Sequence, residues 1–224
     1  MKNYKLFCIA FLLMEVLLYY LIMTTHGKLL VWSEYISIIF CFLFALISFQ
    51  KPLMILGLAL TVCADFFLVI CDPIEQLLGM VFFLGAQIFY AVFLHRQGIS
   101  KNFLIARIAV SIAMEMVTMA ILGQKVDPLA LVSVLYYVNL IMNMVCAFSQ
   151  YPREKHLPIG FLLFILCDTV IGLQVGAGSY LPILEGSFIY DLIFSGFHLS
   201  WFFSVVNFAS ILYSFSLSKF SIIL

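Results

Sequence analysis

Two aspartates in apolar surroundings are the residues of this chain best suited to chemistry. Asp65 lies within residues 55–70 and Asp168 within residues 159–173, and each is the only charged residue of its run. An ionised carboxylate at the centre of a bilayer costs about 3 kcal/mol, so such residues normally face a bundle interior or a wet cavity and serve a function. We therefore take Asp65 and Asp168 as candidate catalytic residues. The alternative is structural, with each acid bridging to a Ser, Tyr or Asn on another helix.

The composition places these acids in a membrane. Of 224 residues, 65% are hydrophobic and only 10% are charged, and the mean hydropathy is +1.18. A soluble domain carries about 25% charged residues, so we expect a single integral membrane domain over residues 1–224. The net charge of zero suggests no nucleic-acid partner. The cysteines form no CxxC pair, the histidines show no HxxxH spacing, and no nucleotide-binding loop is present, so we expect no metal and no cofactor.

Apolar runs long enough to cross a bilayer recur along the whole chain. We count eight, at residues 6–24, 33–49, 52–71, 75–95, 103–122, 129–149, 157–175 and 189–215. Short segments with Gly, Pro or charged residues separate them, so successive spans should pack antiparallel. The predicted fold class is all-α: a polytopic membrane protein with eight transmembrane helices.

The basic residues predict how these spans are oriented. Under the count of eight, nine Lys and Arg residues fall on one side of the membrane and only Lys28 and Lys125 on the other. Basic residues favour the cytoplasmic side, so both termini should be cytoplasmic. We expect the plasma (inner) membrane of a bacterium as the location.

The two halves of the sequence echo one another. Asp65 in the third predicted span corresponds to Asp168 in the seventh, and Glu15 in the first corresponds to Glu115 in the fifth. This pattern indicates a parallel four-plus-four internal repeat, with coincidence between similar apolar helices as the alternative. If the repeat is real, Asp65 and Asp168 converge on a paired-carboxylate site.

The sixth predicted span has a polar face. Tyr136, Asn139, Asn143 and Cys146 follow a spacing of three or four residues, which places them on one side of a helix, and Tyr137 lies beside them. These groups could bind a lipid head group or orient the aspartates. Alternatively, they form ordinary interhelical hydrogen bonds, worth about 0.6 kcal/mol each.

These residues resemble the YhhN-like membrane family, the lysoplasmalogenases, over about residues 50–200. The first family signature is similar to residues 64–68 followed by 79–90, and the middle signature is similar to Tyr137, Ile141, Met144 and Ala147. The second aspartate signature is similar to residues 163–168. The chain departs from the family where Ala64 replaces Gly, Gln87 replaces His and Cys167 replaces Ser. In the last span, Gly196-Phe197-His198 stands in place of a Tyr/Ala-Gln pattern.

The resemblance implies about eight spans and hydrolysis of the vinyl ether bond of a lysoplasmalogen, which gives a fatty aldehyde and glycerophospho-ethanolamine or -choline. This reaction needs one carboxyl to deliver a proton and one carboxylate to stabilise a cation or activate water, and two neighbouring acids can share these roles. The resemblance implies that Asp65 and Asp168 take these two roles, and it does not distinguish the acid from the carboxylate. The expected groups for positioning substrate and water are Gln87, Tyr90, Tyr137, Asn139, Asn143 and His198. The partners would be a lysophospholipid-type substrate and membrane lipids.

Two other classes of protein stay open at the level of sequence. A lipid-binding protein or transporter would use its buried aspartates to couple protons or bind a ligand. A purely structural membrane subunit would have both acids fully engaged by neighbouring helices. A closed cavity with a single entrance and both carboxylates within about 7 Å favours the enzyme. A path open to alternate sides, with the acids far apart, favours transport.

Overall fold

The structure, a computed structural model, describes residues 2–24, 28–48, 51–150 and 156–180. These residues form seven α-helices and two short helical segments, η1 and η2. The helices are α1 Lys2–Thr24, α2 Lys28–Ser48, α3 Pro52–Asp65, α4 Gln76–Arg96, α5 Lys101–Leu122, α6 Pro128–Ser149 and α7 His156–Tyr180. The segment η1, Phe66–Ile70, is a π-helical continuation of α3, and η2, Gly123–Lys125, is a 3-10 turn after α5.

Local sequence explains where several of these helices begin and end. Pro52 and Pro128 occupy the first positions of α3 and α6, where a missing N–H costs nothing. Asp127 caps α6 by accepting a hydrogen bond from the backbone N–H of Ala130 at 2.7 Å. Gly123 has a φ of 55° and ends α5, a backbone conformation that residues with a side chain rarely adopt.

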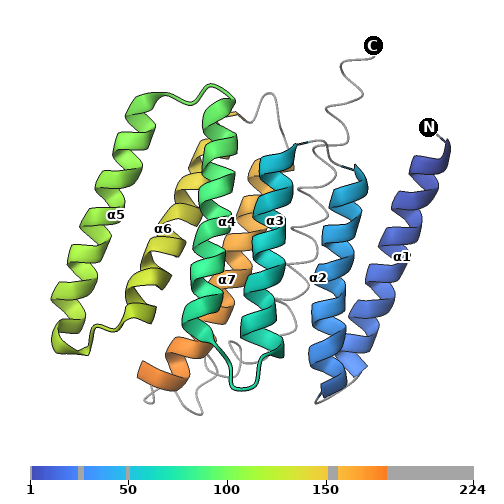
Figure 1. Ribbon diagram of the computed structural model, residues 1–224, viewed down its shortest axis with the longest axis horizontal. Helices are drawn as coiled ribbons and strands as arrows, with labels where there is room; N and C mark the ends of the chain where they lie inside the picture. Colours follow the sequence, from blue (N-terminus) through green and yellow to red (C-terminus); the bar gives the residue numbers. More distant parts are fainter. Residues whose placement is uncertain (1, 25–27, 49–50, 151–155, 181–224) are drawn as a thin grey trace.

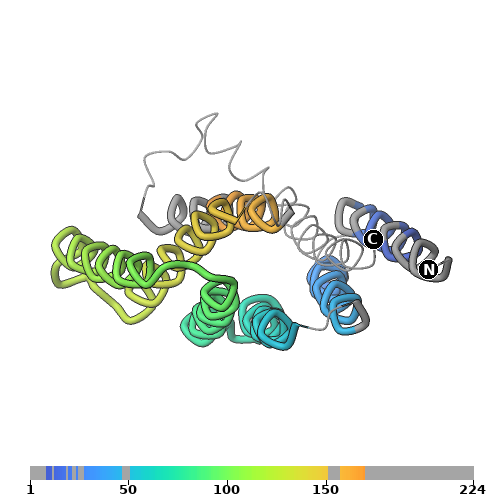
Figure 2. The backbone as a smooth tube through the Cα atoms, turned by 90° about the horizontal axis from the view of Figure 1, so that it is seen from above, coloured from blue at the N-terminus to red at the C-terminus, as the bar shows by residue number. Residues whose placement is uncertain are grey.

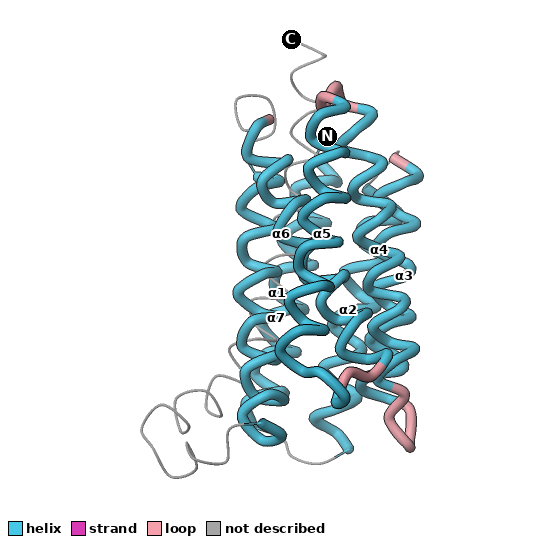
Figure 3. Tube along the Cα trace, turned by 90° about the vertical axis from the view of Figure 1, so that its left-hand side faces the viewer, coloured by secondary structure: helices cyan, strands magenta, loops and turns pink. Residues whose placement is uncertain are grey.

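The helices stand side by side along a common direction (Figures 1 and 3). Viewed from one end, α6 and α7 form one row and α4, α3 and α2 form a second row facing it, with α5 and α1 at opposite ends (Figure 2). Helix α4 packs against α3 and α6, and α6 packs against α5 and α7. The contact between α4 and α6 joins the two rows, because each of these helices belongs to a different row.

The all-helical prediction is confirmed for the described residues, and a helix occupies each of the first seven predicted spans. Within the part of the chain that the structure describes, five helical segments are long and apolar enough to cross a membrane, at Lys28–Leu46, Pro52–Ile70, Gln76–Arg96, Lys101–Lys125 and Pro128–Ser149. These segments support an integral membrane protein. The eighth predicted span, residues 189–215, lies outside the described residues. The count of eight, the internal repeat and the cytoplasmic termini stay predictions.

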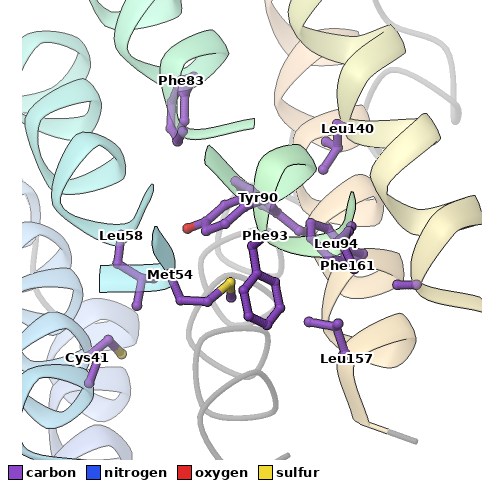
Figure 4. Packing of buried hydrophobic residues seen from close by; sticks show 14 of the residues in the cluster. Cys41, Met54, Leu58, Phe83, Tyr90, Phe93, Leu94, Leu140, Leu157 and Phe161 are labelled. Atoms are coloured by element: carbon purple, nitrogen blue, oxygen red, sulfur yellow. The ribbon is translucent and has the colours of Figure 1, made fainter. Parts of the chain in front are cut away.

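A cluster of buried side chains fills the space between the two rows (Figure 4). Tyr90 of α4 lies near its centre and is only 2% exposed. Its ring meets Phe161 of α7 edge-on, with the ring centroids 5.9 Å apart. Met54 and Leu58 contribute from α3. This packing fixes α3, α4, α6 and α7 against one another, and the acids lie within the same group of helices.

Candidate functional site

The two aspartates lie on different helices and are near one another. Asp65 is the last residue of α3 and is buried, and Asp168 lies in α7. The two carboxyl groups are close enough to interact electrostatically. If two carboxyl groups approach closely in an apolar interior, repulsion between like charges favours the sharing of one proton between them. The helices that carry the acids pack mainly against other helices, α3 against α4 and α7 against α6. The paired-carboxylate site and the repeat that implies it stay predictions.

Asp168 is held by a tyrosine from α6. The hydroxyl of Tyr136 donates a hydrogen bond to Oδ2 of Asp168. The Tyr136 ring packs against the ring of Phe83 on α4, with the two centroids 5.4 Å apart. The Phe83 ring also packs against Phe164 of α7, with a centroid distance of 6.2 Å. One of the two acids therefore has a fixed donor and a fixed orientation.

Asp65 has different surroundings. Among the described residues no side chain donates a hydrogen bond to its carboxyl group, although the residue is only 9% exposed. The hydroxyls of Tyr35 and Tyr90 are close enough to interact with it electrostatically. Directly after Asp65 the helix widens into the π-helical segment η1. Such π segments are frequent at functional sites.

The face of α3 that carries Asp65 is built to receive Tyr90. Gly57, Thr61 and Asp65 follow one another at intervals of four residues, so they share one side of the helix. Tyr90 lies close to Thr61, whose hydroxyl donates to the carbonyl of Gly57 at 3.1 Å. A Cβ atom on Gly57 would lie 2.3 Å from Cε1 of Tyr90. Only glycine leaves room for the tyrosine at this point.

A second polar cluster connects α4, α5 and α6. Arg107 of α5 donates to Oδ1 of Asn139 at 3.2 Å and to Oδ1 of Asn143 at 2.7 Å, and its guanidinium also reaches Sγ of Cys146 at 3.9 Å. Asn143 connects this cluster to α4, because its Nδ2 donates hydrogen bonds to both the backbone oxygen and Oε1 of Gln87, each at 2.9 Å. Arg107, Asn143 and Gln87 are all buried. We call these residues the Arg107 network.

The structure sorts the predicted positioning residues into these two groups. Gln87, Asn139 and Asn143 belong to the Arg107 network, whereas Tyr90 contacts the Asp65 face of α3. Tyr137 exchanges a hydrogen bond with Thr169, the neighbour of Asp168. His198 lies outside the described residues. The polar face of α6 therefore has two partners: Tyr136 contacts an aspartate, while the residues one and two turns further on contact Arg107.

Sequence reasoning missed two members of the site. Tyr136 was recognised as part of the polar face of α6 but not as the donor to Asp168. Arg107 is one of the nine basic residues that predict the orientation of the spans, although it lies six residues inside the apolar helix α5. A guanidinium at that depth is the same kind of signal as a buried carboxylate, and it needs polar partners on a neighbouring helix.

A family model described as the YhhN family matches residues 32–182, which includes both aspartates, Tyr136 and the Arg107 network. No curated protein matches the chain. No solved structure matches it either.

Proposed function

Because this chain belongs to the YhhN family, we propose that it is a membrane hydrolase that cleaves the vinyl ether bond of lysoplasmalogens. The observation that carries the proposal is the electrostatic interaction between two carboxyl groups, that of the buried Asp65 on α3 and that of the half-buried Asp168 on α7. A vinyl ether is hydrolysed by acid catalysis, and a pair of carboxyl groups that holds one proton supplies both an acid and a base.

The unequal surroundings of the two acids support an assignment of roles. Asp168 accepts a hydrogen bond from Tyr136, which suits a carboxylate that stabilises a cation and then takes a proton from water. No described residue donates to Asp65, which suits the member of the pair that carries the proton. We therefore assign Asp65 as the general acid and Asp168 as the carboxylate.

The proposed reaction begins with transfer of the Asp65 proton to the β-carbon of the vinyl ether. The π electrons form the new C–H bond, and the α-carbon and ether oxygen become an oxocarbenium ion next to the Asp168 carboxylate. Asp168 then removes a proton from water as the water oxygen bonds to the α-carbon, which gives a hemiacetal.

Collapse of the hemiacetal completes the reaction. The bond between the α-carbon and the ether oxygen breaks, the hemiacetal hydroxyl loses its proton, and the glycerol oxygen gains one. The products are a fatty aldehyde and a glycerophospho-alcohol, and one water molecule is consumed. The proton on Asp168 returns to Asp65 across the pair, which restores the starting state.

The direct test replaces each aspartate by asparagine. We expect D65N and D168N each to lower fatty aldehyde release from lysoplasmalogen by about 10²–10⁴-fold, the usual contribution of a general acid or base. Purified wild-type and variant proteins are compared in detergent, with thermal unfolding curves as the control for folding. An ordinary acyl lysophospholipid, which has no vinyl ether, should give no aldehyde. Full activity in both variants would exclude the mechanism.

A further inference from the structure

From the Arg107 network we infer that the protein binds the phosphate of a lysophospholipid at Arg107, with the rest of the head group in a cavity at the adjoining end of the bundle. This inference rests on the proposed function and adds to it a binding mode for the polar part of the substrate. It concerns residues that the two-aspartate mechanism does not use.

The first observation is a buried cation without an anion. Arg107 is 8% exposed, and its contacts are to two amide oxygens and a thiol. Among the described residues no carboxylate forms an ion pair with it. A guanidinium stays charged in any protein environment and has five N–H donors arranged to grip a phosphate. A buried charge of this kind is normally paired, so an anionic ligand is the missing partner.

The second observation is a cavity one helical turn away from Arg107. It has a volume of about 410 Å³ and lies where α4 ends and α5 begins, against the last residues of α6. Phe103, four residues before Arg107, is part of its wall, and so are Ser100, Ser149 and Gln150. The cavity is partly open, and polar side chains and the amino-terminal end of α5 line it, which suits the polar head group of a lipid.

The cavity lies at the end of the bundle that carries Lys51, Arg96 and Lys101, the upper end in Figure 1. We call this the basic end; the sequence predicts that it is cytoplasmic. Arg107 lies six residues into α5, which corresponds to a depth of about 9 Å from Lys101. A lipid of the adjoining leaflet could reach this depth with its phosphate while its alkenyl chain stays within the apolar region.

The spacing along α6 agrees with the size of the substrate. Asn143, which contacts Arg107, and Tyr136, which contacts Asp168, are separated by seven residues, or about 10 Å of helix. Seven covalent bonds separate the phosphorus of a lysoplasmalogen from its vinyl β-carbon, and an extended chain of that length spans about 8 Å. A phosphate at Arg107 therefore leaves the vinyl ether at the level of the two aspartates.

Gln87 supplies a further donor between these two points. Its side chain is fully buried, and among the described residues its Nε2 has no hydrogen-bond partner, while its Oε1 accepts from Asn143. A lysophospholipid has a free hydroxyl on the central glycerol carbon, between the phosphate and the vinyl ether. That hydroxyl is a suitable acceptor for Gln87 Nε2, and a lipid with two chains lacks it.

The experiment measures binding, so that it does not depend on catalysis. Acyl lysophosphatidylethanolamine, monoacylglycerol and inorganic phosphate are titrated separately into the purified D65N/D168N double variant in detergent, with R107Q or R96Q added to that background. Arg96 is the matched control, because it is an exposed arginine at the same end of the bundle. We expect R107Q to weaken binding of the lysophospholipid by about 10-fold or more, as for loss of a charged hydrogen bond, and R96Q to leave it unchanged. Monoacylglycerol, which lacks the phosphate, should bind equally to all variants.

Each other outcome has a defined meaning. Equal lysophospholipid binding by R107Q and its parent would overturn the inference. Arg107-dependent binding of inorganic phosphate, without Arg107-dependent binding of the lysophospholipid, would also overturn it, because the lipid head group would then not be the ligand. If R107Q does not fold, R107K keeps the charge but loses the planar set of donors, and it should show the same selective loss. Arg107-dependent binding by a wild-type protein that releases no aldehyde would contradict the proposed function and support the binding site. Aldehyde release without Arg107-dependent binding would support the proposed function and contradict the binding site.

Discussion

At the scale of single residues, the most informative contact is the hydrogen bond from Tyr136 to Asp168. It distinguishes two acids that look equivalent in the sequence. Each acid is a lone charge in an apolar run, so the energetic cost of burial identifies both but cannot rank them. The ranking depends on which neighbouring helix supplies a donor, and that is a tertiary property.

Removal of the Tyr136 hydroxyl tests this distinction. We expect Y136F to lower the kcat of aldehyde release by about 10–100-fold, because Asp168 would lose the donor that orients it. Y20F is the control, since Tyr20 is an exposed tyrosine on α1, which packs against α2 rather than against α3 or α7. Steady-state kinetics on the two purified variants provide the measurement. Equal kcat values for Y136F and Y20F would show that the contact has no catalytic role.

The buried polar residues also show how far sequence reasoning reaches. Asp65 and Asp168 were predictable because a charge in an apolar run stands out, and the polar face of α6 was predictable from its helical spacing. Which of these residues meet was not predictable. Asn139 and Asn143 could equally have faced the aspartates, but they bond to Arg107, whose side chain reaches them from a different helix.

At the scale of helices, the contact between α3 and α4 is set by small residues. Gly57 lies against the ring of Tyr90, and Gly79 of α4 lies against Leu68 of η1 and the carbonyl of Ala64, next to Asp65. Small residues allow helices in a membrane to approach closely, where packing rather than hydrophobicity holds them together. The position of Asp65 therefore depends on two glycines that carry no chemistry of their own.

Substitution of Gly57 by alanine should show this dependence. The new Cβ atom would overlap the Tyr90 ring, so we expect G57A to destabilise the protein by about 1–3 kcal/mol and to reduce aldehyde release by displacing Tyr90 from Thr61. G85A is the matched control, because a Cβ at Gly85 would approach only the flexible end of Leu60, at 3.2 Å. Thermal unfolding in detergent compares the two. A G57A variant as stable as G85A would contradict the packing described here.

At the scale of the whole molecule, the site lies between two rows of helices (Figure 2). The sequence predicted the helices well, because apolar runs of spanning length are a strong signal. It did not predict the contact between α4 and α6 or the placement of α5 at one end, since lipid-facing and helix-facing sides are equally apolar in such runs.

The orientation of the bundle in the membrane is testable from the connections between helices. A short epitope tag inserted at Gly98, at the basic end, should be accessible to antibody only after the cells are permeabilised. The same tag at Gln124, at the opposite end, should be accessible on intact cells. The reason is the excess of basic residues on one side of the predicted spans. The reverse pattern would place the Arg107 cavity on the outer face of the membrane.

The measurement that tests the central claim most directly is hydrolysis of lysoplasmalogen by the purified protein in heavy water, with immediate reduction of the aldehyde to trap it. Proton transfer from the aspartate pair to the vinyl β-carbon predicts one deuterium on the carbon next to the aldehyde group. It also predicts that D65N and D168N form almost none of this labelled product. The account would be contradicted by an absence of aldehyde, by aldehyde without the deuterium, or by labelled aldehyde formed at the wild-type rate in both variants.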